Sequence, residues 1–384
     1  MAGRQLNFFF SAGEASGDMY AAWFLEALRA RAPEARCFGC AGARLREAGC
    51  EALLESERIA MVGLAEVATE VPRVWRLYRA LLREALARRP DLAVLVDAPD
   101  FNLRLARHFR RAGVPVLYLV APQAWAWRPW RARQIARVVD RLLCIFPFEE
   151  EWFRKRGVNA EYIGHPLGGR VAPRLTRSAF FAEHALDPAR PLVVLLPGSR
   201  RREVALNLPV MAEAARRWPA QTAVALPPGL PAPPTPFPLL RGASHDALAH
   251  ADVAVIASGT ATIEGALLGT PMAVVYRVTE PTWWLGRLLV RTPFYSMVNL
   301  VAGRRVVPEL IQADFTPERL SGEVERLLND EQARAEMQAQ LRDVAARLNA
   351  AGDPFERAAG RAMELLETRR AGAAASPVAA GGPA

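Results

Sequence analysis

The sequence predicts an α/β protein made of two Rossmann-like, doubly wound domains followed by helices. Three observations predict this fold. Short apolar segments alternate with longer segments of helical period, which is typical of a parallel sheet covered by helices. The alternation starts again after a connector at residues 164–173. The chain of 384 residues is also too long for one ordinary hydrophobic core, so two domains are expected.

The first half opens with an apolar segment at 6–10, expected as a strand, and a helix at 18–31. Further strands of this half are expected at 36–40, 92–96, 114–120, 141–146 and 161–163. Segments of helical period lie among them at 73–88, 101–112, 130–139 and 149–156. Ligands of doubly wound sheets bind at the carboxyl ends of strands, so the turns that follow these strands are the candidate sites.

In the second half, strands are expected at 192–196, 222–226, 253–256 and 272–276. Residues 227–238 are so rich in proline that they cannot form a helix or a central strand, and we expect a surface loop. The chain is helical in pattern from 316 to about 370. Residues 371–384 are small and lack an apolar period, which indicates a disordered tail.

Composition excludes an integral membrane protein, because the mean hydropathy is only +0.03 and the longest uncharged stretch, 112–127, is too short and broken to span a bilayer. The N-terminus lacks the apolar region of a signal peptide, so we expect a cytoplasmic protein. A net charge of +9 and a pI near 10.1 suit nucleic acid, an anionic membrane surface or anionic substrates.

Four cysteines occur, two of them in a C-x-x-C pattern: Cys37, Cys40, Cys50 and Cys144. Since neither a second such pair nor paired histidines follow, we expect buried free thiols and no metal site.

A polar turn, Ser11 to Asp18, follows the first strand. It matches neither the dinucleotide fingerprint nor the phosphate-binding loop that ends in Gly-Lys-Ser/Thr. A glycine turn with Ser16 or Asp18 as helix N-cap would explain part of this segment, but it would not explain Glu14.

Two turns of the second half are candidates for binding a nucleoside diphosphate. In the first, Ser199 and Arg200 precede a helix whose free N–H groups and dipole favour an anion, although an ordinary capped helix explains the turn equally well. In the second, Ser258 is a candidate N-cap, and Gly259 and Thr260 could approach phosphate. Glu264 lies one turn deeper, where its carboxylate could accept hydrogen bonds from ribose hydroxyls.

Two carboxylates and two tryptophans follow strands of the first half. Asp100 is explained as an N-cap, whereas Asp97 ends an apolar strand, where partial burial would raise its pKa toward that of a general base. A solvated turn is the alternative. Trp125 and Trp127 lie in the loop after the next strand, where aromatic faces could bind sugar rings or acyl chains or simply pack in the core.

The segment 66–88 interleaves arginines with apolar residues, and 282–291 repeats this pattern. Both could be helices packed on a sheet or helices in contact with a membrane surface. The side chains that we expect to contact an acyl chain or a membrane are Val67, Val71, Val74, Trp75 and Tyr78, together with the tryptophans at 125 and 127.

Taken together, six motifs closely resemble the lipid-A-disaccharide synthase family, in that family's order. They are SAGEASGD at 11–18, DAPDFN at 97–102, WAW at 125–127, GHPL at 164–167, LPGSR at 196–200 and SGTAT at 258–262. Two departures are Ala121, where the family usually has Ser, and Val298, where Pro often precedes the asparagine.

The resemblance implies a GT-B fold and an inverting, metal-independent transferase without a cofactor. It would join UDP-2,3-diacylglucosamine to 2,3-diacylglucosamine 1-phosphate (lipid X) through a β(1→6) bond in lipid A biosynthesis and release UDP. Asp97 would be the catalytic base, with Glu14 and Ser16 beside it. The UDP site would comprise Ser199, Arg200, Ser258, Gly259, Thr260, Glu264, Asn299 and Gln312.

Under this resemblance, residues 1–168 would bind the acceptor and 174–350 the UDP-sugar. Residues 351–370 would be a helix that packs back toward the first domain, and 371–384 the disordered tail. The enzyme would work in the cytoplasm as a peripheral protein on the inner face of the cytoplasmic membrane, and a homodimer is left open. Two alternatives are a UDP-sugar 2-epimerase of the same architecture and a basic nucleic-acid-binding protein. Dispersed arginines and the lack of a recognition motif speak against nucleic acid.

Overall fold

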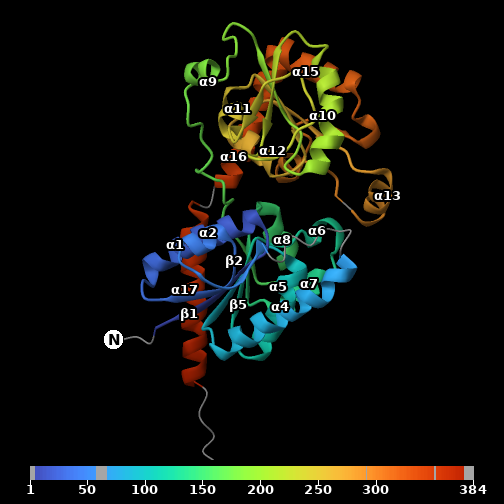
Figure 1. Cartoon of the computed structure of the whole chain (residues 1–384). Helices are drawn as coiled ribbons and strands as arrows, with labels where there is room; N and C mark the ends of the chain where they lie inside the picture. The colour runs from blue at the N-terminus through green and yellow to red at the C-terminus, as the bar shows by residue number, and fades with distance from the viewer. Residues whose placement is uncertain (1–4, 58–66, 291, 350–351, 376–384) are drawn as a thin grey trace, which may run out of the picture. The chain divides into compact units, whose positions relative to one another are not determined.

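A computed structural model describes residues 5–57, 67–290, 292–349 and 352–375 (Figure 1). The chain divides into two compact units: unit 1 comprises residues 1–166 and 351–384, and unit 2 comprises residues 167–350. Each unit contains one parallel sheet with helices, so the predicted pair of Rossmann-like domains is confirmed.

In the described part of unit 1, the sheet has seven parallel strands in the order β3-β2-β1-β4-β5-β6-β7. Their bounds are β1 Asn7–Ala12, β2 Arg36–Ala41, β3 Glu51–Glu55, β4 Leu92–Val96, β5 Val116–Leu119, β6 Arg141–Cys144 and β7 Ala160–Tyr162. The chain turns from β1 toward β2 on one side, and β4 then lies on the other side of β1. The point where the strand order reverses therefore lies between β1 and β4.

Helices cover both faces of this sheet, which explains why its central strands are apolar throughout. Phe8 and Phe10 of β1 are fully buried in one core with Phe24, whereas Phe9 lies in the other core with Phe109. The helices are α1 Ala15–Arg31, α2 Ala43–Glu47, α4 Val67–Ala87, α5 Pro99–Arg111, α6 Ala124–Trp127, α7 Arg131–Val138, α8 Pro147–Arg154 and α17 Pro354–Ala375.

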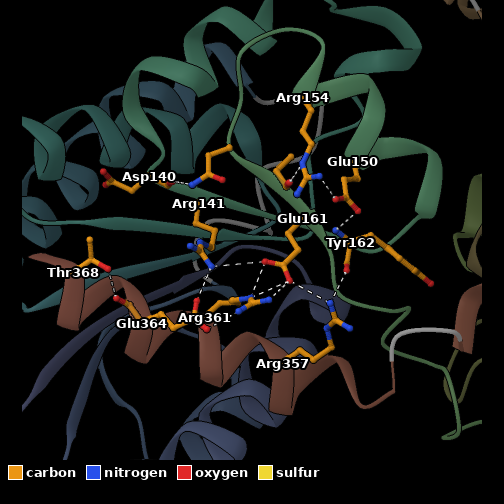
Figure 2. A network of polar contacts seen from close by, with 12 residues as sticks. Asp140, Arg141, Glu150, Arg154, Glu161, Tyr162, Arg357, Arg361, Glu364 and Thr368 are labelled. Atoms are coloured by element: carbon orange, nitrogen blue, oxygen red, sulfur yellow. Dashed lines mark hydrogen bonds and ion pairs between the residues drawn. The ribbon is translucent and has the colours of Figure 1, made fainter.

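Helix α17 follows unit 2 in the chain but packs on unit 1, beside α1 (Figure 1). Figure 2 shows how Glu161 at the sheet edge faces arginines of this helix: Arg361 Nε donates to its carboxylate at 2.8 Å and Arg357 at 3.2 Å. Arg141 of β6 lies 3.7 Å from the same carboxylate. Burial would raise the pKa of Glu161, but these arginines hold it below the ordinary value. The carboxylate is therefore ionised and anchors the helix.

Unit 2 has six parallel strands in the order β10-β9-β8-β11-β12-β13, so its strand order reverses between β8 and β11. The strands are β8 Leu192–Leu196, β9 Gln221–Leu226, β10 Leu239–Arg241, β11 Val253–Ala257, β12 Met272–Tyr276 and β13 Glu309–Ile311. The helices are α9 Arg177–Glu183, α10 Arg201–Ala215, α11 Ser244–His250, α12 Thr260–Leu267, α13 Glu280–Leu289, α14 Met297–Ala302, α15 Pro317–Asn329 and α16 Glu331–Asn349, with a 3-10 turn η1 Gln312–Asp314.

The structure corrects several expectations. Strands β3, β10 and β13 were not expected, and helix α17 continues to Ala375 rather than ending near residue 370. Residues 376–384 of the expected tail lie outside the described part of the chain. All four cysteines are buried free thiols, as predicted. None of the helices in the described ranges is both long and apolar enough to cross a membrane.

Candidate functional site

The reversal point of unit 1 brings two of the predicted motifs together. Ser11 and Ala12 of β1 pair with Leu95 and Val96 of β4, so both strands end at the same level. The SAGEASGD turn therefore lies beside the DAPDFN turn. An alanine Cβ at Gly13 would lie only 2.6 Å from the Cβ of Ala98, and this close approach requires glycine.

Asp97 and Ala98 connect β4 to α5 through an unusual backbone. Their φ angles are 49° and 42°, so two consecutive residues that are not glycine adopt the left-handed conformation. Such residues are disfavoured sterically and cluster at functional sites. Helix α5 begins immediately afterwards at Pro99, with Ala98 as its N-cap.

The prediction that Asp100 is the N-cap of this helix is therefore wrong. Asp100 lies in the first helical turn, and its carboxylate accepts hydrogen bonds from Arg131 and from Arg128, the latter at 3.3 Å.

The carboxyl group of Asp97 is mostly buried and has an altered acidity. Burial, followed by the nearby Glu14 carboxylate, raises its pKa from 3.8 to about 6, although a hydrogen bond from the Ala98 N–H opposes the rise. Near neutral pH the group is ionised but basic enough to accept a proton from a hydroxyl as the hydroxyl attacks. These are the properties of a general base.

Three buried polar side chains that were not predicted surround the Asp97 turn. Asn102 Nδ2 donates to the carbonyl oxygens of Asp97 at 2.8 Å and Val96 at 3.0 Å. Its Oδ1 accepts from Ser11 Oγ at 2.6 Å. The Tyr118 hydroxyl donates to the Asp97 carbonyl oxygen. No local sequence signal marks these contacts, because they join residues from β1, β4, β5 and α5.

The other predicted residues of the first turn have different surroundings. Glu14 is exposed at the N-cap of α1 without a capping side-chain hydrogen bond, and Ser16 is exposed. Asp18 does not cap its own helix: its carboxylate accepts from Gly42 N at 2.7 Å and Arg44 N at 2.9 Å at the start of α2. Asp18 is thus structural, whereas Glu14 and Ser16 are available to a ligand.

Trp125 and Trp127 lie in the short helix α6 after β5. Trp125 is partly buried, and its indole N–H donates to Glu149 at 3.0 Å. Burial raises the pKa of Glu149 to about 7. Trp127 is 38% exposed, and the guanidinium of Arg128 lies 3.8 Å from its ring centroid. Only Trp127 of the two presents a substantial surface to solvent.

The residues of helix α4 that were expected to contact lipid differ in their exposure to solvent. Tyr78 is buried against Phe101, so its expected membrane contact is wrong. Trp75, stacked on Tyr78, is 41% exposed, and Val74 is half-buried. The side chains of Val67 and Val71 lie outside the described residues.

The reversal point of unit 2 brings together the turns that contain Arg200 and Ser258, since β8 pairs with β11. The Glu203 carboxylate accepts from Ser199 N at 2.9 Å and from Arg200 N at 3.3 Å, so the helix start is less free than predicted. Arg200 also bonds this carboxylate at 3.2 Å, yet its side chain is 75% exposed. An anionic ligand would compete with Glu203 for these donors.

Ser258 is not the N-cap of α12, because its hydroxyl donates to Tyr295 O at 2.8 Å and Gly259 occupies the cap position. Gly259 and Thr260 are exposed at the helix start. The Glu264 carboxylate lies 3.7 Å from His245 Nε2, and its proximity raises the pKa of His245.

Asn299 and Gln312 are buried with their polar atoms already engaged. Asn299 Oδ1 accepts from Val306 N and Val307 N, and its Nδ2 donates to Val307 O and Glu309. Gln312 Oε1 accepts from Val278 N, and its Nε2 donates to Val278 O and Glu280. These contacts suit residues that hold loops in place rather than free ligands of a nucleotide.

Among the described residues, no group of three or more histidine, cysteine, aspartate or glutamate side chains could hold a metal ion.

Solved structures share the fold. The calicheamicin glycosyltransferase CalG4 is 18% identical, with a TM-score of 0.61 over 95% of this chain and 99% of its own. A protein assigned as a UDP-N-acetylglucosamine 2-epimerase from Listeria monocytogenes is 15% identical, with a TM-score of 0.61 over 96% of this chain and 98% of its own. At such identities the likeness concerns the fold alone, which is the predicted GT-B architecture.

Sequence comparison is more specific. The chain is 50% identical over 370 residues to a lipid-A-disaccharide synthase of Solibacter usitatus, covering 93% of this chain and 97% of that protein. The family model for lipid-A-disaccharide synthetase matches residues 8–225 and 236–355, which include both reversal points and every predicted site residue. The chain belongs to the lipid-A-disaccharide synthase family.

Proposed function

We propose that this enzyme transfers 2,3-diacylglucosamine from its UDP donor to 2,3-diacylglucosamine 1-phosphate and forms a β(1→6) disaccharide 1-phosphate and UDP. The observation that carries the proposal is the Asp97 turn. A mostly buried carboxyl group with a pKa near 6 ends a central strand at the reversal point of a doubly wound sheet. Family membership supplies the substrates.

In the proposed reaction, the Asp97 carboxylate accepts the proton of the acceptor's 6-hydroxyl. The hydroxyl oxygen forms a bond to the anomeric carbon from the face opposite UDP. The bond between that carbon and the diphosphate oxygen breaks, and UDP leaves with the electron pair. One inversion at the anomeric carbon follows from this single displacement. The proposal needs no metal, because proton transfer and stabilisation of the leaving group come from side chains and helix starts.

The UDP leaving group is proposed to bind at the reversal point of unit 2. Arg200 and the N-termini of α10 and α12 would neutralise the diphosphate, with Ser199, Gly259 and Thr260 at the same helix starts. Glu264 would accept hydrogen bonds from the ribose, and Ser258 would keep its loop in place through Tyr295. Asn299 and Gln312 would support the site through the loops that they hold.

The decisive experiment mixes the purified enzyme with both acylated sugars and follows products by mass spectrometry. We expect a tetraacyl disaccharide 1-phosphate and an equal amount of UDP. The epimerase alternative is tested in parallel with UDP-N-acetylglucosamine alone, because an epimerase needs no second sugar. Epimer formation without any disaccharide in the first reaction would contradict the proposal.

We further propose that the enzyme works as a peripheral protein on the cytoplasmic face of the inner membrane. Trp75 and Trp127 in unit 1 and Trp284 in unit 2 are 41%, 38% and 61% exposed. A guanidinium lies over each ring, that of Arg79, Arg128 and Arg287 respectively. Exposed indoles beside arginines suit an anionic lipid surface.

Co-sedimentation with vesicles of phosphatidylglycerol and phosphatidylcholine tests this contact. The single variants Trp75→Ala and Trp127→Ala should each bind the vesicles more weakly than the wild type does. Leu239→Ala, in which the replaced side chain is also 38% exposed, should bind like the wild type. Binding by both tryptophan variants that equals binding by Leu239→Ala would contradict a role for the tryptophans. The oligomeric state, for which a homodimer is the open alternative, is measured by light scattering on the same samples.

A further inference from the structure

We infer that Asn102, supported by Ser11 and Tyr118, is a positioning residue that holds Asp97 in its left-handed turn and thereby aims the catalytic carboxylate. The inference rests on the proposed role of Asp97 as the base. It adds three residues to which neither the motifs nor the family comparison assigns a task.

The backbone of the Asp97 turn is unfavourable in isolation. Asp97 and Ala98 both have side chains, yet their φ angles of 49° and 42° lie where glycine is normally required. A single left-handed residue is common enough in turns, but two in succession persist only when surrounding contacts favour them. Contacts that favour this backbone should therefore be present in the structure.

Hydrogen bonds from Asn102 and Tyr118 supply those contacts. The Asn102 amide donates to the carbonyl oxygens on both sides of the strand end, Val96 at 3.0 Å and Asp97 at 2.8 Å. It also lies 3.3 Å from Ser11 O, so the same group ties β4 to β1. The Tyr118 hydroxyl from β5 donates to the Asp97 carbonyl oxygen as well. Two donors from different elements thus fix the direction of the Asp97 peptide.

Asn102 has no simpler role as a helix-forming or helix-capping residue. It is the fourth residue of α5 and is fully buried, and leucine would favour the helix more than asparagine does. The Asn102 side chain does not cap the helix, because the turn carbonyls and Ser11 engage all of its polar atoms. Ser11, equally buried, donates to Asn102 Oδ1 at 2.6 Å and fixes the orientation of the amide.

The direction of the Asp97 peptide sets where its carboxylate lies relative to the reacting hydroxyl oxygen. If the Asp97 peptide rotates out of the left-handed region, the carboxylate moves away from the position set by the turn. A displacement of about 1 Å in a catalytic group costs on the order of 100-fold in rate. Substrate binding should change much less, because the polar atoms of Asn102 all face the protein.

The test uses full-length Asn102→Leu and Tyr118→Phe, with Leu105→Ala as the matched control. Leu105 is fully buried on the same helix and its side chain takes part in none of the hydrogen bonds of the turn, so its truncation loosens α5 without removing any of them. We expect Asn102→Leu to lower kcat about 100-fold with KM for both substrates within about threefold. Tyr118→Phe should lower kcat by a smaller factor of roughly 10, and the control should keep kcat within about twofold.

A second readout does not depend on turnover. The carboxyl carbon of 13C-labelled aspartate reports the titration of Asp97, which lies near Glu14 at the start of α1 and Tyr118 of β5. Both groups are retained in Asn102→Leu and in the control, so a changed midpoint only in Asn102→Leu supports the positioning role. Tyr118→Phe is left out of this comparison of midpoints, because it removes the Tyr118 hydroxyl that lies near Asp97 together with the hydrogen bond to the turn.

The outcomes separate the two levels of the proposal. An active Asp97→Asn enzyme would overturn the base assignment itself. An inactive Asp97→Asn enzyme together with wild-type kcat and midpoint in Asn102→Leu would overturn only the positioning role. Should Asn102→Leu fail to fold, Tyr118→Phe decides, since phenylalanine fills the same space: kcat equal to that of wild type and the control would overturn the inference.

Discussion

The acidity of Asp97 leads to a prediction about stability that is independent of substrate. A carboxyl group whose pKa is raised by burial is held in its ionised form at the expense of folding free energy. Replacing it by the neutral Asp97→Asn removes that cost. The variant should therefore be inactive and yet more stable than the wild type near neutral pH, which is the trade expected of a buried catalytic group.

The magnitude follows from the two pKa values. In the unfolded chain the group has its ordinary pKa of 3.8, and in the folded protein about 6. Well below pH 3.8 the carboxyl is protonated in both states and contributes no difference. As pH rises from about 4 to 6 the unfolded state loses its proton first, so the wild type loses stability over this window. The two pKa values differ by about 2.2, which lowers the free energy of unfolding of the wild type by about 3 kcal/mol above pH 6.

Hydrogen exchange of the β4 amides, measured for both proteins at pH 4, 6 and 8, reports opening of unit 1. Comparing the proteins at equal pH cancels the intrinsic exchange rate and the titration of other groups. Protection of Asp97→Asn should be close to that of the wild type at pH 4 and exceed it by much more at pH 8. Equal protection at both pH values, or a variant less protected at pH 8, would refute the reasoning about burial.

Three further predictions concern single side chains. Glu14→Gln removes the second cause of the raised Asp97 pKa, so the acid limb of kcat/KM against pH should move to lower pH. The move should be less than half of the interval from 3.8 to about 6, because burial is the larger cause. An unchanged acid limb would contradict the proximity of the two carboxylates. Arg200→Ala should weaken UDP binding about 10-fold by calorimetry, whereas the exposed control Arg190→Ala should bind like the wild type, and equal affinities would remove Arg200 from the site. Asp18→Ala leaves two N–H groups at the start of α2 without their acceptor and should lower stability by about 1–2 kcal/mol with kcat nearly unchanged; an unaltered melting temperature would argue against the cap.

The central strands could be predicted because burial on both faces leaves a continuous apolar segment. β4 and β8 were predicted with the bounds that the structure has. Of the four edge strands, only β7 was predicted, within one residue of its bounds. The other three were not: β3 contains glutamate at both ends, and β10 and β13 are three residues long. Each of these strands forms because the preceding strand of its sheet offers free backbone groups, and a segment this short or this polar carries no apolar pattern of its own.

The candidate site shows the same division. Asp97 and Glu14 could be predicted because each directly follows a strand, and the order of strands then places them at one reversal point. Asn102 could not be given a role, since its partner Ser11 is 91 residues away and meets it only in the register of β1 with β4. Ser258 was wrongly expected to be a helix N-cap, because the local sequence does not indicate that its hydroxyl donates to Tyr295 O, 37 residues away.

The most direct measurement of the central claim compares turnover and UDP affinity in Asp97→Asn. A positioned base contributes about 100-fold to 10,000-fold, so disaccharide formation should fall at least 100-fold while UDP binds within about twofold of the wild-type affinity. Turnover within 10-fold of the wild type would contradict the claim that this carboxylate removes the proton from the acceptor.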